Sequence, residues 1–304
     1  MLTEELIKNA EKGDMDTLVK LDANGFLIGA DETARDFSQR LHTLLEKLTN
    51  LKKQVSEKEV YEIEGMKFKS KGLIPKRDFE AAMKTNLDLY DFAIDWVPGF
   101  YQNPSMGWLF GGCCYTSEPD FFSFFQVRET FKTKNRWLFY NRDELVAHEL
   151  CHVARSGIDA KKFEEFFAYK TSPKTFRRSF GSALYSSSDT YTILLASLTL
   201  PVMQYLRLKG TVTLPFWPFI TLFLLLIANF IRRYFSLNNN FKKACRNLTP
   251  IFGEKVQSVL FRCSDSEIVQ FAALSGQPLK EKIDQLSTQN LRWRVISERF
   301  KHNG

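Results

Sequence analysis

The sequence lacks paired cysteines and the pattern of an N-terminal signal peptide, which are typical of secreted proteins. Its cysteines are odd in number and form no C-x-x-C pair, which argues against a disulfide framework and favours a reducing compartment: Cys113, Cys114, Cys151, Cys245 and Cys263. The first residues, MLTEELIKNAEKGDMD, carry charges almost from the start and lack an apolar stretch, so no cleaved signal peptide is expected. Histidine is also scarce, with four in 304 residues.

Two long stretches of the chain contain no charge. One lies between Asp189 and Arg207, and the other lies between Lys209 and Arg232. A helix needs about 20 apolar residues to cross the hydrocarbon layer of a bilayer, with a lower limit near 17. The connection, RLKG, fits only a tight turn, so we predict a two-helix transmembrane hairpin over residues 189–233. A buried helical hairpin inside a soluble core is the alternative.

Basic residues flank the outer ends of this predicted hairpin. Only Arg207 and Lys209 lie in the turn, whereas a larger set lies at the outer ends: Lys170, Lys174, Arg177, Arg178, Arg232, Arg233, Lys242, Lys243 and Arg246. The positive-inside rule therefore predicts a multi-pass protein with both termini in the cytoplasm, together with the site described below. These cations would meet anionic headgroups of the lipid bilayer, which accounts for the formal net charge of +7 without a nucleic-acid partner.

The rest of the chain divides into three regions. Residues 1–95 have helical periodicity, with helices expected at Leu2–Leu21, Thr33–Val55 and Pro75–Ile94. Residues 96–185 begin with a segment of chain breakers, WVPGFYQNPSMG, and continue with short aromatic segments that predict a small sheet leading into helices. Residues 236–304 are polar and helical in pattern, with Ser264 or Asp265 as a helix cap. The predicted fold class is therefore α+β.

One stretch, NRDELVAHELCHVARSG at residues 141–157, contains an H-E-x-x-H arrangement at His148, Glu149 and His152. Residues four apart share one face of a helix, so both imidazoles can reach one metal ion at about 2.0–2.1 Å. Glu149 lies one step round the helix, where it can take a proton from a water that zinc activates for attack on a carbonyl. Cys151 faces away from the histidines and is expected to be a packing residue. The alternative is an amphipathic helix with two surface histidines.

A third metal ligand has to come from another segment. His42 and His302 are far away in sequence, so a carboxylate is the better candidate. The segment DAKKFEEFFAYK has phenylalanines spaced for the buried side of a second helix, which leaves Glu164 and Glu165 beside the face that meets the first. We prefer Glu165 and keep Glu164 open, and either could instead be a solvated surface glutamate.

HELCH followed by EFFAY resembles the gluzincin branch of the zincin metallopeptidases, in which a glutamate on a following helix completes the H-E-x-x-H motif. The resemblance, which covers about residues 121–169, implies a zincin-like catalytic core, zinc as cofactor, His148, His152 and Glu165 as ligands, and Glu149 as general base. With the hydrophobic hairpin, the chain also resembles the heat-shock membrane peptidases and CAAX-prenyl endopeptidases. In those families the glutamate follows the hairpin and reads E-x-x-A-D, whereas here it precedes the hairpin and Tyr169 replaces the aspartate.

Further roles are predicted for residues around the motif. Tyr169 or Arg155 could stabilise an oxyanion or support the metal ligands, with packing of Tyr169 and pairing of Arg155 with an acid as the alternatives. Asp143 and Asp159 could orient a histidine N–H group. Strand residues 121–127 could bind substrate as an added strand at a sheet edge.

These patterns predict a membrane-anchored, zinc-dependent metallopeptidase that acts on a peptide or protein substrate. The H-E-x-x-H motif lies in a polar segment well before the uncharged stretches, so cleavage is expected in water near the membrane surface. The rival prediction is a non-catalytic, membrane-anchored interaction protein whose metal site is structural or vestigial.

Overall fold

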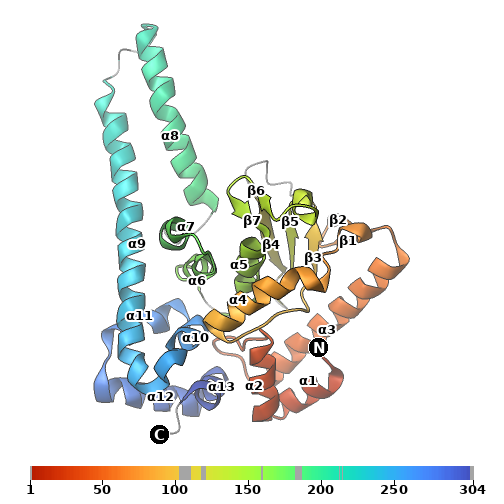
Figure 1. Cartoon of the computed structure of the whole chain (residues 1–304). Helices are drawn as coiled ribbons and strands as arrows, with labels where there is room; N and C mark the ends of the chain where they lie inside the picture. The colour runs from red at the N-terminus through yellow and green to blue at the C-terminus, as the bar shows by residue number, and fades with distance from the viewer. Residues whose placement is uncertain are drawn as a thin grey trace.

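The computed structural model describes residues 2–102, 111–117, 121–158, 160–181, 187–211, 213 and 215–301. Within these residues, helices are combined with small two- and three-stranded sheets, which confirms the predicted α+β class. Figure 1 shows one body made of the strands and most of the helices, from which two long helices project on one side.

The N-terminal region consists of helices followed by a β-hairpin. Thr33 caps the longest of these helices in a capping box with Asp36, and Phe37 on its inner face is fully buried. The hairpin turns at Glu64 and Gly65, which both have positive φ angles, and the helical periodicity of this region does not predict it. The elements are α1 (Glu4–Glu11), α2 (Met15–Ala23), α3 (Ala34–Glu57), β1 (Val60–Ile63) and β2 (Met66–Lys69).

The next helix is shorter than the predicted segment Pro75–Ile94. Two 3-10 turns, η1 (Ser70–Gly72) and η2 (Lys76–Phe79), precede α4 (Glu80–Tyr90). The helix ends at Asp91, whose φ of 56° is incompatible with a continuing right-handed helix. Inside α4, the side-chain amide of Asn86 donates to the backbone carbonyl of Ala147, so α4 supports the helix that carries the histidines.

The central sheet has the order β3-β5-β4, with β3 (Gly99–Tyr101) parallel and β4 (Gly112–Ser117) antiparallel to β5 (Phe122–Val127). β5 is buried along its whole length, with β4 paired along one side and β3 paired with Phe125–Val127 on the other. The prediction that residues 121–127 offer a sheet edge is therefore wrong, and β4 is an outer strand among the described residues. The predicted chain breaker WVPGFYQNPSMG contributes strand β3, and its residues 103–107 lie outside the described part of the chain.

The histidine-bearing helix follows the sheet, as predicted. Asn141 starts it, because its side-chain oxygen accepts hydrogen bonds from the backbone N–H groups of Asp143 and Glu144. The elements between the sheet and the long helices are η3 (Glu129–Lys132), β6 (Arg136–Trp137), β7 (Tyr140–Asn141), α5 (Arg142–Arg155), α6 (Glu164–Lys170) and α7 (Thr175–Phe180).

The two projecting helices are α8 (Ser187–Leu208) and α9 (Trp217–Phe252) (Figure 1). They lie side by side, and Arg233 of α9 pairs with Asp189 of α8 at 2.8 Å between Nη2 and Oδ2. By length and composition, the helix that begins at Trp217 can cross a membrane, and only 11% of its most apolar window is buried. α9 continues without a break past residue 233, the predicted end of the hairpin. A second span in α8 stays a prediction, as does the cytoplasmic position of the termini.

The C-terminal helices pack against the rest of the protein and do not form a separate tail. Ser264 caps α11 in a capping box with Glu267, which decides between the two predicted caps. Phe261 stacks on Tyr90 of α4 with 4.3 Å between ring centroids, so one hydrophobic core continues from α4 through α5 and α6 to the C-terminal helices. These elements are η5 (Gly253–Lys255), α10 (Val256–Phe261), α11 (Asp265–Ala273), α12 (Gly276–Gln289) and α13 (Leu291–Phe300).

Candidate metal centre

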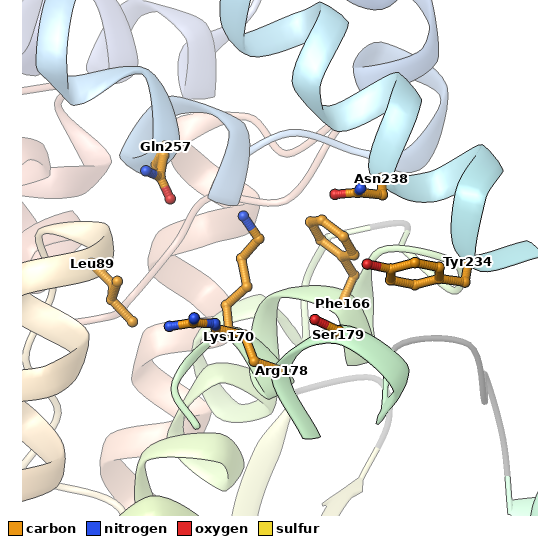
Figure 2. Close-up of a pocket in the computed structure, with 8 residues that line it drawn as sticks. All are labelled: Leu89, Phe166, Lys170, Arg178, Ser179, Tyr234, Asn238 and Gln257. Carbon is orange, nitrogen blue, oxygen red and sulfur yellow. The ribbon is translucent and has the colours of Figure 1, made fainter. Parts of the chain in front are cut away.

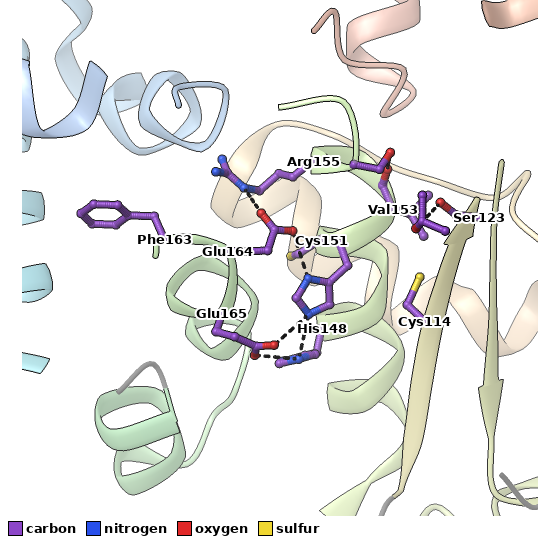
Figure 3. Close-up of polar contacts among 12 residues, drawn as sticks. Cys114, Ser123, His148, Cys151, Val153, Arg155, Phe163, Glu164 and Glu165 are labelled. Carbon is purple, nitrogen blue, oxygen red and sulfur yellow. Dashed lines mark hydrogen bonds and ion pairs between the residues drawn. The ribbon is translucent and has the colours of Figure 1, made fainter. Parts of the chain in front are cut away.

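Helix α5 buries one face and turns its two histidines toward α6. Val146 and Leu150 on the core side are fully buried, whereas the side chains of His148 and His152 retain 13% and 19% exposure. Figure 3 shows two carboxylates reaching from α6 toward this face of α5. The site is therefore assembled from two helices that the sheet and the C-terminal helices hold together.

Three of these side chains form a triangle that suits a metal ion. Nε2 of His148 lies 3.2 Å from Nε2 of His152, and the carboxylate oxygens of Glu165 lie 3.5 Å from the first nitrogen and 3.6 Å from the second. Ligand atoms about 2.0–2.1 Å from a tetrahedral ion are about 3.3 Å from one another, so one ion fits between them with a position left open. His148, His152 and Glu165 thus form a cluster that could hold a metal, which agrees with the preferred ligand set.

Glu164, the other predicted candidate for the third ligand, contacts the outer side of His152 instead. Its Oε1 lies 3.0 Å from Nδ1 of His152, and its Oε2 accepts a hydrogen bond from Nε of Arg155 at 2.8 Å (Figure 3). The backbone carbonyl of Ala168 is a hydrogen-bond partner of His148. Outer contacts of this kind orient metal-binding imidazoles and make them more basic.

Arg155 is completely buried, and its donors bind groups outside the triangle. It donates to Glu164 and to the backbone carbonyls of Phe261 and Cys263. Its guanidinium also lies 4.7 Å from the centre of the Phe167 ring. These contacts match the alternative in which Arg155 pairs with an acid, and they give it a structural role in place of the predicted oxyanion role.

The carboxyl of Glu149 is buried beside the outer strand of the sheet. Burial raises its pKa to about 7, with Glu165 acting in the same direction, while His152 and the backbone N–H of Cys114 partly offset the shift. Cys114 belongs to β4, so this contact joins the metal-site helix to the strand edge. A carboxyl group with a pKa near 7 can both accept and release a proton at neutral pH.

Without a metal, the cations that face the carboxylates of Glu164 and Glu165 are Arg155 and a protonated His152. Burial and the neighbouring His152 keep the pKa of His148 far below its usual value, so this imidazole is neutral. Burial also disfavours a charged His152, but Glu165 and Glu164 outweigh that effect and raise its pKa to about 10. A divalent cation would take over the role of that proton and balance the carboxylates, so the donor set fits a metal in charge as well as in geometry.

Tyr169 packs directly against the triangle. Its ring meets that of His148 edge-on, with 4.7 Å between the ring centroids. Burial and the nearby Glu165 raise the pKa of its hydroxyl, so the group stays protonated. Gly181 approaches so closely that a Cβ atom there would lie 2.4 Å from the tyrosine ring. The packing role of Tyr169 is therefore observed, and a role toward an oxyanion stays a prediction.

The remaining residues considered from the sequence lie elsewhere. His42 pairs with a glutamate of α1 at 3.3 Å, and Asp143 accepts a hydrogen bond from the preceding arginine instead of a histidine. Asp159 and His302 lie outside the described residues. Cys151 is fully buried, as expected for a packing residue.

No protein-family model, curated protein or solved structure matches this chain. The interpretation of the site therefore depends on its own geometry and chemistry. One supporting residue is not visible from the motif: Asp265 of α11 accepts hydrogen bonds from the backbone N–H groups of residues 161–163 and so holds the start of α6. A helix cap at this position can be read from the sequence, but its contact with α6 cannot.

A mostly apolar cavity of about 770 Å³ adjoins the site at Tyr169. Its walls come from the β6–β7 hairpin, α7 and both long helices, including Phe139, Tyr140, Phe176, Ile193, Ile227 and Phe230. The candidate metal centre thus has a polar side at β4 and an apolar side toward the projecting helices.

Proposed function

We propose that this protein is a membrane-anchored, zinc-dependent metallopeptidase. The observation that carries the proposal is the His148–His152–Glu165 triangle with the buried carboxyl of Glu149 on the same helix. When bound, zinc supplies a Lewis acid and a water molecule whose pKa is lowered toward about 7. Two imidazoles and one carboxylate with an open position are a donor set that catalytic zinc commonly uses.

Glu149 is the group that moves the proton in this proposal. Its pKa of about 7 lets it take a proton from the attacking water and then return it to the leaving amine. The resemblance of HELCH to the zincin motif assigns the same role to this glutamate. Its hydrogen bond from the backbone N–H of Cys114 keeps the carboxyl beside the strand along which a substrate would lie.

The outer strand β4 is the surface proposed for the peptide substrate. An extended peptide that adds to this strand would run past Glu149, because Cys114 of β4 already contacts that side chain. The apolar cavity at Tyr169 lies on the other side of His148 and would receive an apolar side chain of the same peptide.

Membrane anchoring is supported by the surface of α9. Leu222, Leu224 and Leu225 point in different directions around this helix, and each is more than half exposed. A helix that is apolar on all sides and exposed is suited to lipid, which favours the membrane over a buried hairpin in a soluble core. We further propose α8 as the second span and a cytoplasmic position for the termini and the metal centre, which the basic residues at the outer ends support.

The rival function, a non-catalytic protein with a structural metal, is less well supported by the ligand set. Structural zinc sites are usually closed by four protein ligands, whereas the cluster found among the described residues has three. A buried carboxyl with a pKa of about 7, as found for Glu149, also suits a general base and is not required by a purely structural site.

The deciding experiment compares Glu149→Gln with a matched control, Glu129→Gln, an exposed glutamate in η3. Zinc content is measured on the purified full chain, and hydrolysis is measured with a quenched library of unstructured peptides. Loss of the general base should reduce turnover roughly 10²- to 10⁴-fold while zinc stoichiometry stays unchanged, and the control should match the wild type. Equal turnover in both variants, or metal-loaded wild-type protein that cleaves nothing, would contradict the proposal.

A further inference from the structure

A second cavity lies on another face of α6, away from the metal triangle. Its volume is about 320 Å³, and five helices contribute to its wall: α4, α6, α7, α9 and α10 (Figure 2). Two cationic side chains, Lys170 of α6 and Arg178 of α7, line it together with Asn238 and Gln257. In Figure 2 the ammonium of Lys170 points toward these two amides, and the guanidinium of Arg178 lies closer to Leu89.

The positive charge in this cavity, here called the lysine pocket, has no acidic partner. Within the described residues, neither Lys170 nor Arg178 forms an ion pair with a carboxylate. The ammonium of Lys170 instead lies 3.7 Å from the centre of the Phe241 ring and 4.9 Å from that of Phe166. Lys242 adds a further positive charge nearby.

The charged form of Lys170 is disfavoured in this cavity. Burial lowers its pKa to about 8, and Arg178 and Lys242 act in the same direction. Cys245 acts in the opposite sense only when ionised, and burial raises the pKa of that thiol to about 11, so it is neutral at pH 7. A bound anion would relieve this unbalanced positive charge.

The uncharged groups of the lysine pocket suit an oxyanion. Asn238 and Gln257 bring side-chain amides, which carry N–H donors, to the wall of the cavity. Arginine and lysine, combined with neutral donors and without a carboxylate, are a typical donor set for a phosphate group. We propose that the lysine pocket binds an anionic phosphate group.

The position of the lysine pocket indicates where that phosphate comes from. Tyr234 lies three residues after Ile231, the last apolar residue before the basic pair Arg232–Arg233, which corresponds to roughly 5 Å along the helix. In the proposed membrane placement, the pocket begins at the level of the lipid headgroups at Tyr234 and extends roughly 10 Å further along α9 toward Phe241, which the Lys170 ammonium contacts. Basic pockets between helices on this side of a membrane bind phospholipid headgroups. A phospholipid headgroup is thus the expected source, and free phosphate is the other. The proposal depends on the membrane placement for this source and is independent of peptidase activity.

The test measures binding to the purified full chain in a neutral detergent by titration calorimetry. The probes are dihexanoylphosphatidic acid, inorganic phosphate, and dihexanoylphosphatidylcholine as a zwitterionic reference. Replacing Lys170 by Gln removes a charge-assisted hydrogen bond and should weaken binding of the anionic lipid roughly tenfold or more, as should Arg178→Gln. Lys170→Arg keeps the charge and should retain most of the affinity. The matched control is Lys243→Gln, an exposed neighbour on α9 that does not line the pocket.

Each outcome has a defined meaning. Tighter binding of phosphatidic acid than of inorganic phosphate, lost in Lys170→Gln but kept in Lys243→Gln, supports a headgroup site. Similar affinities with the same mutational pattern support a site for free phosphate. Phosphate bound at the metal centre would be insensitive to Lys170→Gln. No binding by any anionic probe, or equal losses in Lys170→Gln and Lys243→Gln, would overturn the proposal. Arg178 is exposed, so its variant remains informative if Lys170→Gln does not fold.

Discussion

The candidate metal centre and the lysine pocket share the short helix α6, yet they treat charge in opposite ways. At the start of the helix, Glu164 is paired with Arg155 and His152, and Glu165 faces both histidines. At its end, Lys170 lines a cavity together with Arg178 of α7, and neither has a carboxylate partner among the described residues. One face of α6 thus supplies anionic groups for a cation, while another face presents a cation, Lys170, for the proposed anion.

The largest expected effect separates the two adjacent glutamates of the metal centre. Structural zinc sites with four ligands have binding free energies of about 10–16 kcal/mol, so one ligand contributes about 2.5–4 kcal/mol. Glu165→Gln should therefore weaken zinc binding by more than about 100-fold. Glu164→Gln removes an outer contact and should cost about 10- to 100-fold. Competition with a chelator measures both affinities, and equal losses would remove the distinction between ligand and outer partner.

The second prediction contrasts Arg155, beside the candidate metal centre, with Arg178, in the lysine pocket. Arg155→Met removes one of the two cations that pair with the mostly buried Glu164 and leaves the carbonyls of Phe261 and Cys263 without their donor, so it should lower the free energy of unfolding by about 3 kcal/mol. Arg178→Met removes an exposed cation with no acidic partner among the described residues and should change it by less than about 0.5 kcal/mol. Thermal or denaturant unfolding of metal-free protein in one detergent checks both. Similar destabilisation by the two variants would show that Arg178 is also structurally paired.

The smallest effect concerns the pH dependence of Lys170. The pKa of its folded form is about 8, below the ordinary value of 10.5, so the unfolded state binds more protons between about pH 8 and 10.5. The penalty on the folded state is therefore complete below pH 8 and disappears as the pH rises through this window. Lys170→Met should stabilise the protein on the order of 1 kcal/mol at pH 7, after allowance for solvent screening, and should have no effect near pH 10.5. A stability difference that does not change with pH would contradict this account.

Local patterns in the sequence predict the elements that carry the metal ligands. The spacing of His148 and His152 places both on one face of α5, and the capping pattern at Ser264 predicts the start of α11. The two glutamates on α6 are also expected from the spacing of the phenylalanines, although the choice between them requires the structure. Their opposite roles depend on which side of His152 each oxygen approaches.

Contacts between distant segments could not be predicted in the same way. Arg155 binds the carbonyl of Phe261, which lies 106 residues later in the chain, and no periodicity encodes such a pairing. The position of residues 122–127 at the centre of the sheet depends on β3, a three-residue strand in a segment rich in turn residues. The sequence did not predict the hairpin β1–β2, because its strands are short and follow a long helical pattern.

Because α9 is one continuous helix, it fixes the distance between the proposed bilayer and the candidate metal centre. Phe241 of α9 contacts Phe166, the neighbour of Glu165, at 4.9 Å between ring centroids. Ten residues separate Phe241 from Ile231, which corresponds to a height of roughly 15 Å below the apolar part of the helix. An extended chain covers about 3.3–3.6 Å per residue, so a polypeptide leaving the membrane would reach this level after roughly four to five residues. In the proposed membrane placement, the protein would then cleave the peptide bonds that lie at this distance from the lipid surface.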